Sequence, residues 1–114
     1  MTAPRCLFCQ ILEGEVPADV VAESPHSLAF RDIDPMAPSH VLVVPRRHVE
    51  HLGALGGYAA ELADVVGLAT RVAADEGLDQ GYRLVANTGA MAGQTVFHAH
   101  LHLLGGREMR WPPG

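Results

Sequence analysis

The chain has 114 residues, of which 48% are hydrophobic and 18% charged, so it has the material for one small domain around a single core. Eight basic residues, all arginine, stand against 13 acidic ones and form no basic run, which argues against tight electrostatic binding to nucleic acid. The chain's start lacks the apolar stretch of a signal peptide, and no run approaches the ~20 apolar residues of a membrane span. We therefore expect a cytoplasmic single domain, residues 1–114, with neither nucleic acid nor a membrane as partner.

The first half of the chain predicts a short helix followed by three strands. Residues Leu7–Leu12 have a helical pattern that Gly14 and Pro17 stop. Turn signals at Ser24-Pro25 and Asp34-Pro35 separate the segments that follow. The expected strands lie at about Asp19–Glu23, Ser27–Arg31 and His40–Pro45.

The second half predicts one long helix and two more strands. The helix should run from about Gly57 to Glu76, with Gly77 as its C-terminal stop. Its apolar residues at helical spacing are Leu62, Val65, Val66, Ala69, Val72 and Ala73. Strands at Tyr82–Asn87 and Phe97–Leu104 complete the set. Short connections favour an α+β fold with an antiparallel sheet of about five strands and two helices. The long helix packs on one face of the sheet, and the short helix is the other helix of the fold.

Three of the chain's seven histidines, His98, His100 and His102, recur at every second position near the C-terminus. Successive side chains of a strand point to opposite faces, so these imidazoles should share one face. The first and last would be about 13 Å apart, too far for a single zinc ion to bind all three. A solvated stripe or satisfied core histidines are the bland alternatives. Because imidazole suits proton transfer and phosphoryl transfer near neutral pH, the pattern indicates a reactive site.

A glycine-rich loop, Asn87–Thr95, leads directly into the histidines. Such loops can turn backbone N–H groups toward an anion, because glycine permits a close approach and positive φ angles. Most glycine-rich loops only turn a hairpin, but one beside a candidate nucleophile is a candidate phosphate cradle. His100, the central histidine, is the predicted nucleophile.

Together these residues resemble the histidine-triad family, whose signature is His-φ-His-φ-His-φ-φ with φ apolar. The resemblance covers nearly the whole chain and is carried by GYRLVANTGAMAGQTVFHAHLHLLGG (81–106), Phe8-Cys9, Ala29–Ile33, Pro38–His40, Val43–Pro45 and Trp111–Gly114. The last of these is similar to the Hint branch of the family. The family resemblance implies a sheet extended across a homodimer. It also implies a covalent nucleotidyl-histidine intermediate that water then hydrolyses.

The resemblance also assigns roles to residues around His100. It implies that His102, Asn87, Gly93, Gln94 and Thr95 stabilise the phosphate oxygens and that His40 and His98 belong to the histidine cluster. Asp32 corresponds to the carboxylate that binds the ribose hydroxyls, for which two acceptor oxygens are apt. The apolar positions around a purine base are Val16, Phe30 and Ile33. Read without the resemblance, Thr95 caps a turn, Asp32 is a turn residue and the three apolar residues are core.

Cys6 and Cys9 form a CxxC pair at the start of the chain. A redox pair usually stands at a helix that follows a strand, which the start of the chain does not offer. With His48 and His98 the pair would complete a Cys₂His₂ zinc set, as in some bacterial relatives. Hint-branch chains with the Trp-Pro-Pro-Gly ending often lack these cysteines, so this chain combines features of two branches. We expect a structural zinc and no cofactor needed for catalysis.

Trp111 lies in a tail whose prolines favour an extended path. It either plugs the edge of its own domain or, as the resemblance implies, reaches the other subunit's active site and shapes the choice of leaving group.

The function implied is hydrolysis of purine nucleoside 5′-phosphoramidates, with release of an amine such as lysine. Two alternatives stay open: a dinucleoside polyphosphate hydrolase, and a nucleotide-binding or interaction module without catalysis.

Overall fold

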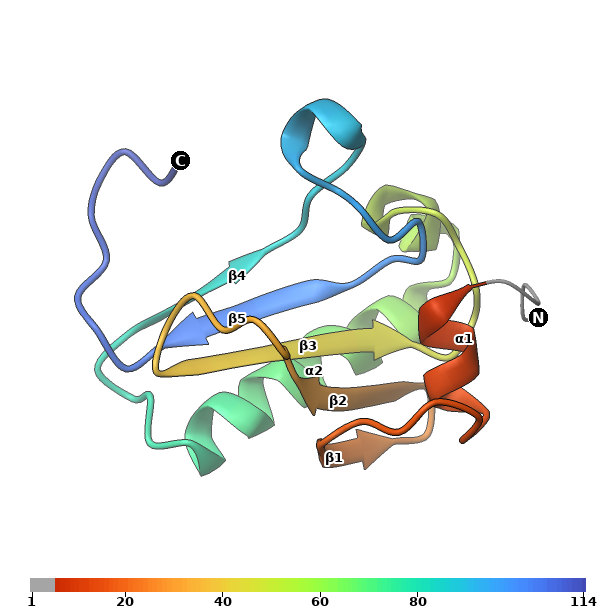
Figure 1. Cartoon of the computed structure of the whole chain (residues 1–114), viewed down its shortest axis with the longest axis horizontal. Coiled ribbons are helices and arrows are strands. Elements are labelled where there is room, and N and C mark those ends of the chain that lie inside the picture. Colours follow the sequence, from red (N-terminus) through yellow and green to blue (C-terminus); the bar gives the residue numbers. More distant parts are fainter. Residues whose placement is uncertain (1–5) are drawn as a thin grey trace.

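Five antiparallel strands and two α-helices make up the fold in the computed structural model, which describes residues 6–114 (Figure 1). In chain order the elements are α1 (Leu7–Leu12), β1 (Val20–Ser24), β2 (Ser27–Arg31), β3 (Ser39–Pro45), α2 (Ala59–Asp75), β4 (Tyr82–Val85) and β5 (Leu101–Gly105), with short 3₁₀ turns at Leu52–Gly57 and Ala90–Ala92. The strand order is β1-β2-β3-β5-β4, so β1 and β4 are the edges. The α+β architecture expected from the sequence is confirmed.

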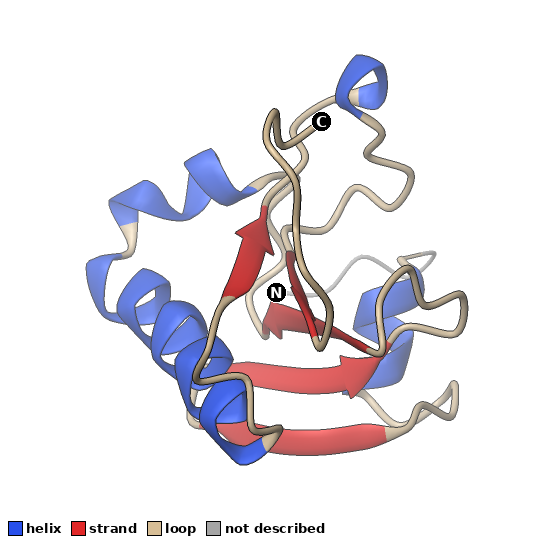
Figure 2. Cartoon of the chain, turned by 90° about the vertical axis from the view of Figure 1, so that its left-hand side faces the viewer, coloured by secondary structure: helices blue, strands red, loops and turns tan. Residues whose placement is uncertain are grey.

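The two faces of the sheet are covered differently. α2 lies along one face, whereas the much shorter α1 lies on the opposite side near one end of the strands (Figure 2). The core under α2 includes Ala29, Val41, Val43, Val65, Leu68, Val72, Leu101 and Leu103. The smaller core under α1 contains Phe8, Leu28, Phe30, Leu42 and Val44. Because α1 has only six residues, it covers only part of its face of the sheet.

Strand alternation places the site on the α1 face. In β3 the odd-numbered residues pack under α2, so His40 points to the other side together with Leu42 and Val44. In β5 the same argument directs His102 away from α2, because Leu101 and Leu103 lie beneath that helix. β3 pairs with β5, and the register sets Leu42 opposite His102. His40 and His102 are therefore diagonal neighbours on one face.

The last strand is shorter than the sequence pattern predicts. Its pairing with β3 begins at Leu101, opposite Val43, so the expectation that all three histidines lie on one strand is wrong. The preceding segment leaves the ladder because the N–H of Ala99 donates instead to the carbonyl of Val49, at 2.7 Å. Only His102 lies within β5. β4 likewise ends at Val85, where its pairing with His102 ends, rather than at the expected Asn87.

The long helix agrees with its pattern except at one buried position and at its start. Val66, expected in the core, is 41% exposed, while Leu68 is 2% exposed and belongs to the core. The helix begins at Ala59 because the residues before it form a 3₁₀ turn, capped by His51 Nδ1 accepting from the N–H of Ala54. Gly77 follows the helix with φ of +73°, as expected for a C-terminal stop.

Within residues 6–114, no helix has both the length and the apolar character to cross a bilayer. The expected domain, 1–114, and the expectation for the chain's start also include residues 1–5, which lie outside the described part.

Candidate active site

His100 is a buried imidazole whose reactive nitrogen can be assigned from its contacts. Its Nδ1 lies 2.8 Å from the carbonyl oxygen of His98, and a carbonyl can only accept, so Nδ1 carries the proton. Burial lowers the pKa of His100 below its usual value, although the bond to the His98 carbonyl and the charge of Asp32 oppose this. The ring is therefore neutral near pH 7, with a lone pair on Nε2. That is the form in which an imidazole acts as a nucleophile.

A second pair of imidazoles, His40 and His102, forms a chain of defined tautomers. The backbone N–H of Met36 donates to His40 Nδ1 at 3.0 Å, so the proton of a neutral His40 is on Nε2. That Nε2 lies 2.9 Å from His102 Nδ1, which must accept. His102 is left with its proton on Nε2. Burial, with smaller contributions from His100 and His40, lowers the pKa of His102 to about 4, so its ring is also neutral.

The rings of His100 and His102 are neighbours, with a centroid separation of 4.9 Å and an angle of 60° between their planes. One offers an unprotonated nitrogen and the other an N–H donor. A nucleophile beside a donor is the arrangement needed to attack an electrophilic centre while stabilising the charge that develops on its oxygens.

Asp32 lies beside this pair, just beyond β2. Its Oδ2 is 3.4 Å from His40 Nε2, and its Oδ1 accepts from the backbone N–H of Asp34 at 2.8 Å. The carboxylate is anchored by the turn and part-exposed, so it retains acceptor capacity for a ligand. Asp32 thus adjoins the imidazoles and is a candidate binding group as well as a turn residue.

The loop before the histidines is organised by a buried amide. Gln94 donates to the carbonyls of Glu50 and Val96, at 2.6 and 3.1 Å, and accepts from the N–H of Gly89 at 2.9 Å. Gly89 and Gly93 have φ angles of +89° and +90°, a conformation that favours glycine. The side chain of Gln94 therefore holds the loop in shape, and its role in phosphate binding stays a prediction. Thr95 is exposed and Asn87 half-buried.

The three apolar residues assigned to a purine base differ in burial. Phe30 is a core residue, and Val16 is half-buried. Ile33 is fully exposed, so a core role for its side chain is wrong. An apolar side chain held in solvent beside Asp32 is available to a ligand.

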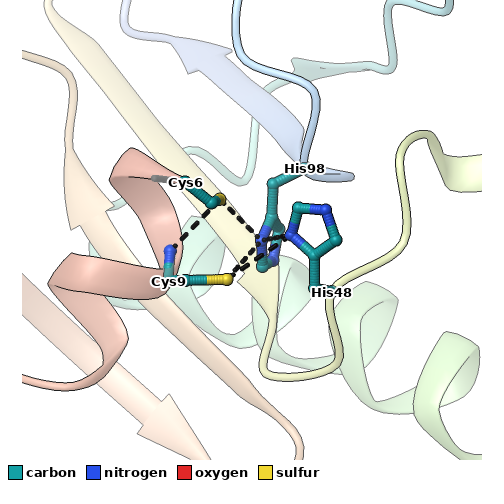
Figure 3. A group of neighbouring side chains, drawn as sticks. All are labelled: Cys6, Cys9, His48 and His98. Carbon is teal, nitrogen blue, oxygen red and sulfur yellow. Dashed lines mark hydrogen bonds between the residues drawn. The ribbon is translucent and has the colours of Figure 1, made fainter. Parts of the chain in front are cut away.

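The two cysteines converge with two histidines in a separate cluster (Figure 3). Sγ of Cys6 and Sγ of Cys9 lie 3.4 and 3.5 Å from His98 Nδ1, and Sγ of Cys9 is 3.4 Å from His48 Nδ1. The two Nδ1 atoms are 3.1 Å apart. His98 Nε2 is 2.8 Å from the carbonyl of Pro45 and must donate, so its Nδ1 presents a lone pair to the cluster.

These donors fit a tetrahedral zinc ion. Bond lengths of 2.3 Å to sulfur and 2.0–2.1 Å to nitrogen imply N–N and S–N separations of about 3.3 and 3.6 Å, close to those in the cluster. The carbonyl that orients His98 is the usual second contact of a ligating imidazole. Burial lowers the pKa of His98 to about 4, which keeps the ring neutral and able to ligate.

The structure divides the sequence-predicted residues between these two places. His40, His100, His102 and Asp32 come together on the α1 face. The side chain of His98 turns away into the cysteine cluster, and only its carbonyl reaches His100.

Trp111 lies in the tail, 84% exposed, so it does not plug the edge of its own domain.

Two contributors were not found from the sequence. Met36 acts through its backbone N–H, which leaves no signal in residue type. Phe8 packs perpendicular to His100, with ring centroids 5.0 Å apart. The sequence shows Phe8 between two cysteines, but no local pattern indicates its contact with His100, 92 residues later in the chain.

Comparison with known proteins agrees with this geometry. The HIT domain family model matches residues 13–109. An uncharacterised HIT-like protein of Synechococcus elongatus is 48% identical over 95% of this chain and 96% of its own length. A protein of Zea mays named as a 14 kDa zinc-binding protein is 44% identical over 95% of this chain and 87% of its own. The crystal structure of a HIT family hydrolase from Legionella pneumophila superposes with a TM-score of 0.92 at 49% identity, covering 96% of this chain and all of that one.

Proposed function

The chain belongs to the HIT domain family, and from that premise we propose that it hydrolyses purine nucleoside 5′-phosphoramidates through a nucleotide covalently bound to His100. The substrate class is a purine nucleoside monophosphate joined to an amine, such as AMP-lysine. One observation carries the proposal: His100 bears its proton on Nδ1, no described residue hydrogen-bonds to its Nε2, and the N–H donor of His102 lies beside it.

In the first step, His100 Nε2 attacks the α-phosphorus. The Nε2–P bond forms as the P–N bond to the amine breaks. The hydrogen bond from the Nδ1–H of His100 to the His98 carbonyl stabilises the imidazolium-like product, because this bond strengthens as the ring gains positive charge. The Nε2–H of His102 stabilises charge on the phosphate oxygens.

The departing amine needs a proton, which we assign to the His40–His102 pair. A bound phosphate is negative and lies against His102, so it raises the pKa of that imidazole from the low value set by burial. The imidazolium can then form and protonate the leaving nitrogen. In the second step water attacks the phosphorus and gives a proton back to the His40–His102 pair. The Nε2–P bond breaks, and the nucleoside monophosphate leaves.

The remaining residues bind the nucleotide. Asp32 accepts from the ribose hydroxyls, and Val16, Phe30 and Ile33 contact the base. Asn87, Gly93 and Thr95 serve the phosphate, with Gln94 holding the loop in shape.

We propose that zinc, held by Cys6, Cys9, His48 and His98, has a structural role. The support is the convergence of four donors, together with the name of the maize relative. When bound, zinc would crosslink the start of the chain to the segments carrying His48 and His98. The reaction above needs no cofactor.

We further propose a homodimer in which the tail bearing Trp111 approaches the partner's site. β4 is an edge strand, and a hollow of about 720 Å³ opens beside it between residues 77–83 and 106–109. Arg83 of β4 donates to carbonyls of Arg110 and Pro113, which directs the tail along this edge. An exposed tryptophan on such a tail suits a contact with a second copy. A monomer mass by sedimentation at micromolar concentration would contradict the dimer.

The function is tested by supplying an adenosine phosphoramidate and a diadenosine polyphosphate in parallel to the wild type and to His100→Ala. We expect the wild type to release the amine, and we expect the rate of release to be about 10⁴-fold or more lower in the variant. Quenching the wild-type reaction should leave AMP on His100, detectable by peptide mass analysis.

Equal amine release by the two proteins would remove the role given to His100. Faster turnover of the polyphosphate would instead identify a dinucleoside polyphosphate hydrolase. Tight nucleotide binding with no turnover of either compound would leave a binding module.

A further inference from the structure

The Cys/His cluster and the candidate nucleophile are joined by Phe8. We propose that Phe8 is a positioning residue for the His100 imidazole, and that zinc in the Cys6–Cys9–His48–His98 cluster holds Phe8 in place. The proposal rests on the proposed function in one respect, namely that His100 is the nucleophile.

Phe8 is buried, and its ring packs against the rings of His98 and His100. Its centroid lies 5.0 Å from that of His100, with the ring planes at 87°, and 5.9 Å from that of His98, at 70°. On another side it packs against Phe30 at 5.6 Å. Perpendicular ring contacts at these distances are favourable and directional. Phe8 thus restricts how the His100 ring can turn.

Phe8 lies on a helix that does not hold its own position. α1 has six residues, far fewer than a helix needs for stability on its own. Within the described residues, the backbone hydrogen bonds of this segment stay inside residues 6–16. Its side chains must therefore anchor it to the sheet, through the small core around Phe8 and through the two cysteines.

The two thiols flank Phe8 in the sequence and fix the start of the helix. Cys6 is the N-cap, where its sulfur accepts from the N–H of Cys9 at 3.4 Å. Both sulfurs also converge on His98 Nδ1 (Figure 3). A zinc ion bonded to both would tie the helix on either side of Phe8 to His98, so the phenyl ring could not withdraw without breaking a metal bond.

The same histidine completes a second link to the nucleophile. The ring of His98 faces the cluster, while its carbonyl accepts from His100 Nδ1 at 2.8 Å. One contact fixes which nitrogen of His100 carries the proton, and Phe8 restricts the direction in which the other nitrogen points. Since misplacing a reacting atom by about 1 Å can cost about 10²-fold in rate, both contacts bear on catalysis.

The experiment compares zinc-loaded wild type with Phe8→Ala, Phe8→Leu and Leu12→Ala. Leu12→Ala is the matched control, because Leu12 packs on the same core from the same helix and has no ring contact with His100. Ring ¹⁵N–¹H correlation spectra report the tautomer of His100. We expect one tautomer, protonated at Nδ1, in the wild type and the control. Without the phenyl ring the imidazole of His100 can turn away from the His98 carbonyl that fixes its tautomer, so Phe8→Ala should show a mixture. Phe8→Leu, which keeps most of the apolar volume, should recover part of the single form. In single turnovers of the phosphoramidate, Phe8→Ala should be slowed about 10-fold relative to the control.

The link to zinc is tested by chelator competition on the same proteins. If zinc holds Phe8 against His100, the coupling is reciprocal, and loss of the phenyl ring must weaken zinc binding. We expect the zinc affinity of Phe8→Ala to be about 5-fold or more below that of Leu12→Ala.

An unchanged His100 tautomer in Phe8→Ala would overturn the positioning role. Equal zinc affinities in Phe8→Ala and Leu12→Ala would overturn the coupling to the cluster. Neither readout needs turnover, so a protein that fails to hydrolyse any nucleotide would refute the proposed function and leave this inference to be decided by the spectra.

Discussion

His98 and His100 are two residues apart in this chain, yet their side chains belong to two sites with different chemistry. In the Cys/His cluster, the Nε2–H of His98 donates to a carbonyl, and Nδ1 points toward the three other candidate metal-ligand atoms. In the active site, His100 donates from Nδ1 to a carbonyl and leaves Nε2 without a protein hydrogen bond among the described residues. The residue type is the same. The carbonyl bonded to one ring nitrogen decides which nitrogen is left for the proposed role, metal ligand in His98 and nucleophile in His100. The predictions below test this division, from the largest expected effect to the smallest.

The largest effect should come from filling the cluster with metal. A ligand that binds only the folded protein, at 1,000 times its dissociation constant, stabilises the fold by about 4 kcal/mol. Zinc at such a concentration should raise the free energy of unfolding of the chelated wild type by that amount, measured by urea titration. Cys9→Ser removes a buried donor and should lose this gain, whereas His26→Gln, a change at an exposed histidine, should keep it. Equal stabilisation of wild type and Cys9→Ser would show that the four residues do not hold a structural ion.

The next effect tests whether tautomers organise the active site. His40→Ala removes the donor to His102 Nδ1, so His102 no longer presents its proton at Nε2 alone. Because one aligned donor or proton-transfer group contributes about 10²-fold or more, kcat for the phosphoramidate should fall by about that factor. His40→Gln should recover part of the loss, because its amide N–H can replace the imidazole donor. If the glutamine and alanine variants are equally slow, His40 acts by packing rather than by fixing a proton.

The difference between these two histidine groups could be predicted from the sequence only in part. Alternation along the strand predicted correctly that His102 lies on the face opposite the buried Leu101 and Leu103, because that rule is local. The turn of His98 into the cluster depends on Cys6 and Cys9, about 90 residues away, and only the resemblance to a family suggested it. The tautomers of the histidines could not be predicted from the sequence, because they depend on hydrogen bonds to backbone groups that every residue carries.

A smaller effect concerns stability in acid. The pKa of His102 is about 4 in the folded protein, lowered by burial and then by its neighbours His100 and His40, against 6.5 in the unfolded chain. Between these values the unfolded chain binds a proton that the folded protein does not, so the contribution is complete above pH 6.5 and is lost as the pH falls toward 4. After allowing for partial exposure of the ring, the loss is about 2 kcal/mol.

His102→Gln removes the titrating group and tests this pH dependence. Urea unfolding at several pH values should show the wild type losing more stability than His102→Gln between pH 7 and pH 4. Zinc release in acid affects both proteins alike, so the difference between them isolates His102. Parallel curves would mean that the ring is not held neutral by the fold.

The smallest effect concerns Ile33, whose exposed side chain can be tested for ligand binding without affecting the stability of the fold. Ile33 follows Asp32 and is fully exposed, so its removal should change the free energy of unfolding by no more than about 0.5 kcal/mol. If its side chain contacts the purine base, Ile33→Ala should raise KM for the phosphoramidate about 10-fold with kcat little changed, because an apolar contact of this size contributes about 1–3 kcal/mol. Val66→Ala is the control, since Val66 is an exposed apolar residue on α2, across the sheet from the histidines. An unaltered KM in Ile33→Ala would leave the base without this contact, whereas a matching loss in Val66→Ala would point to a general effect of surface change. Either result would remove Ile33 from the recognition of the base.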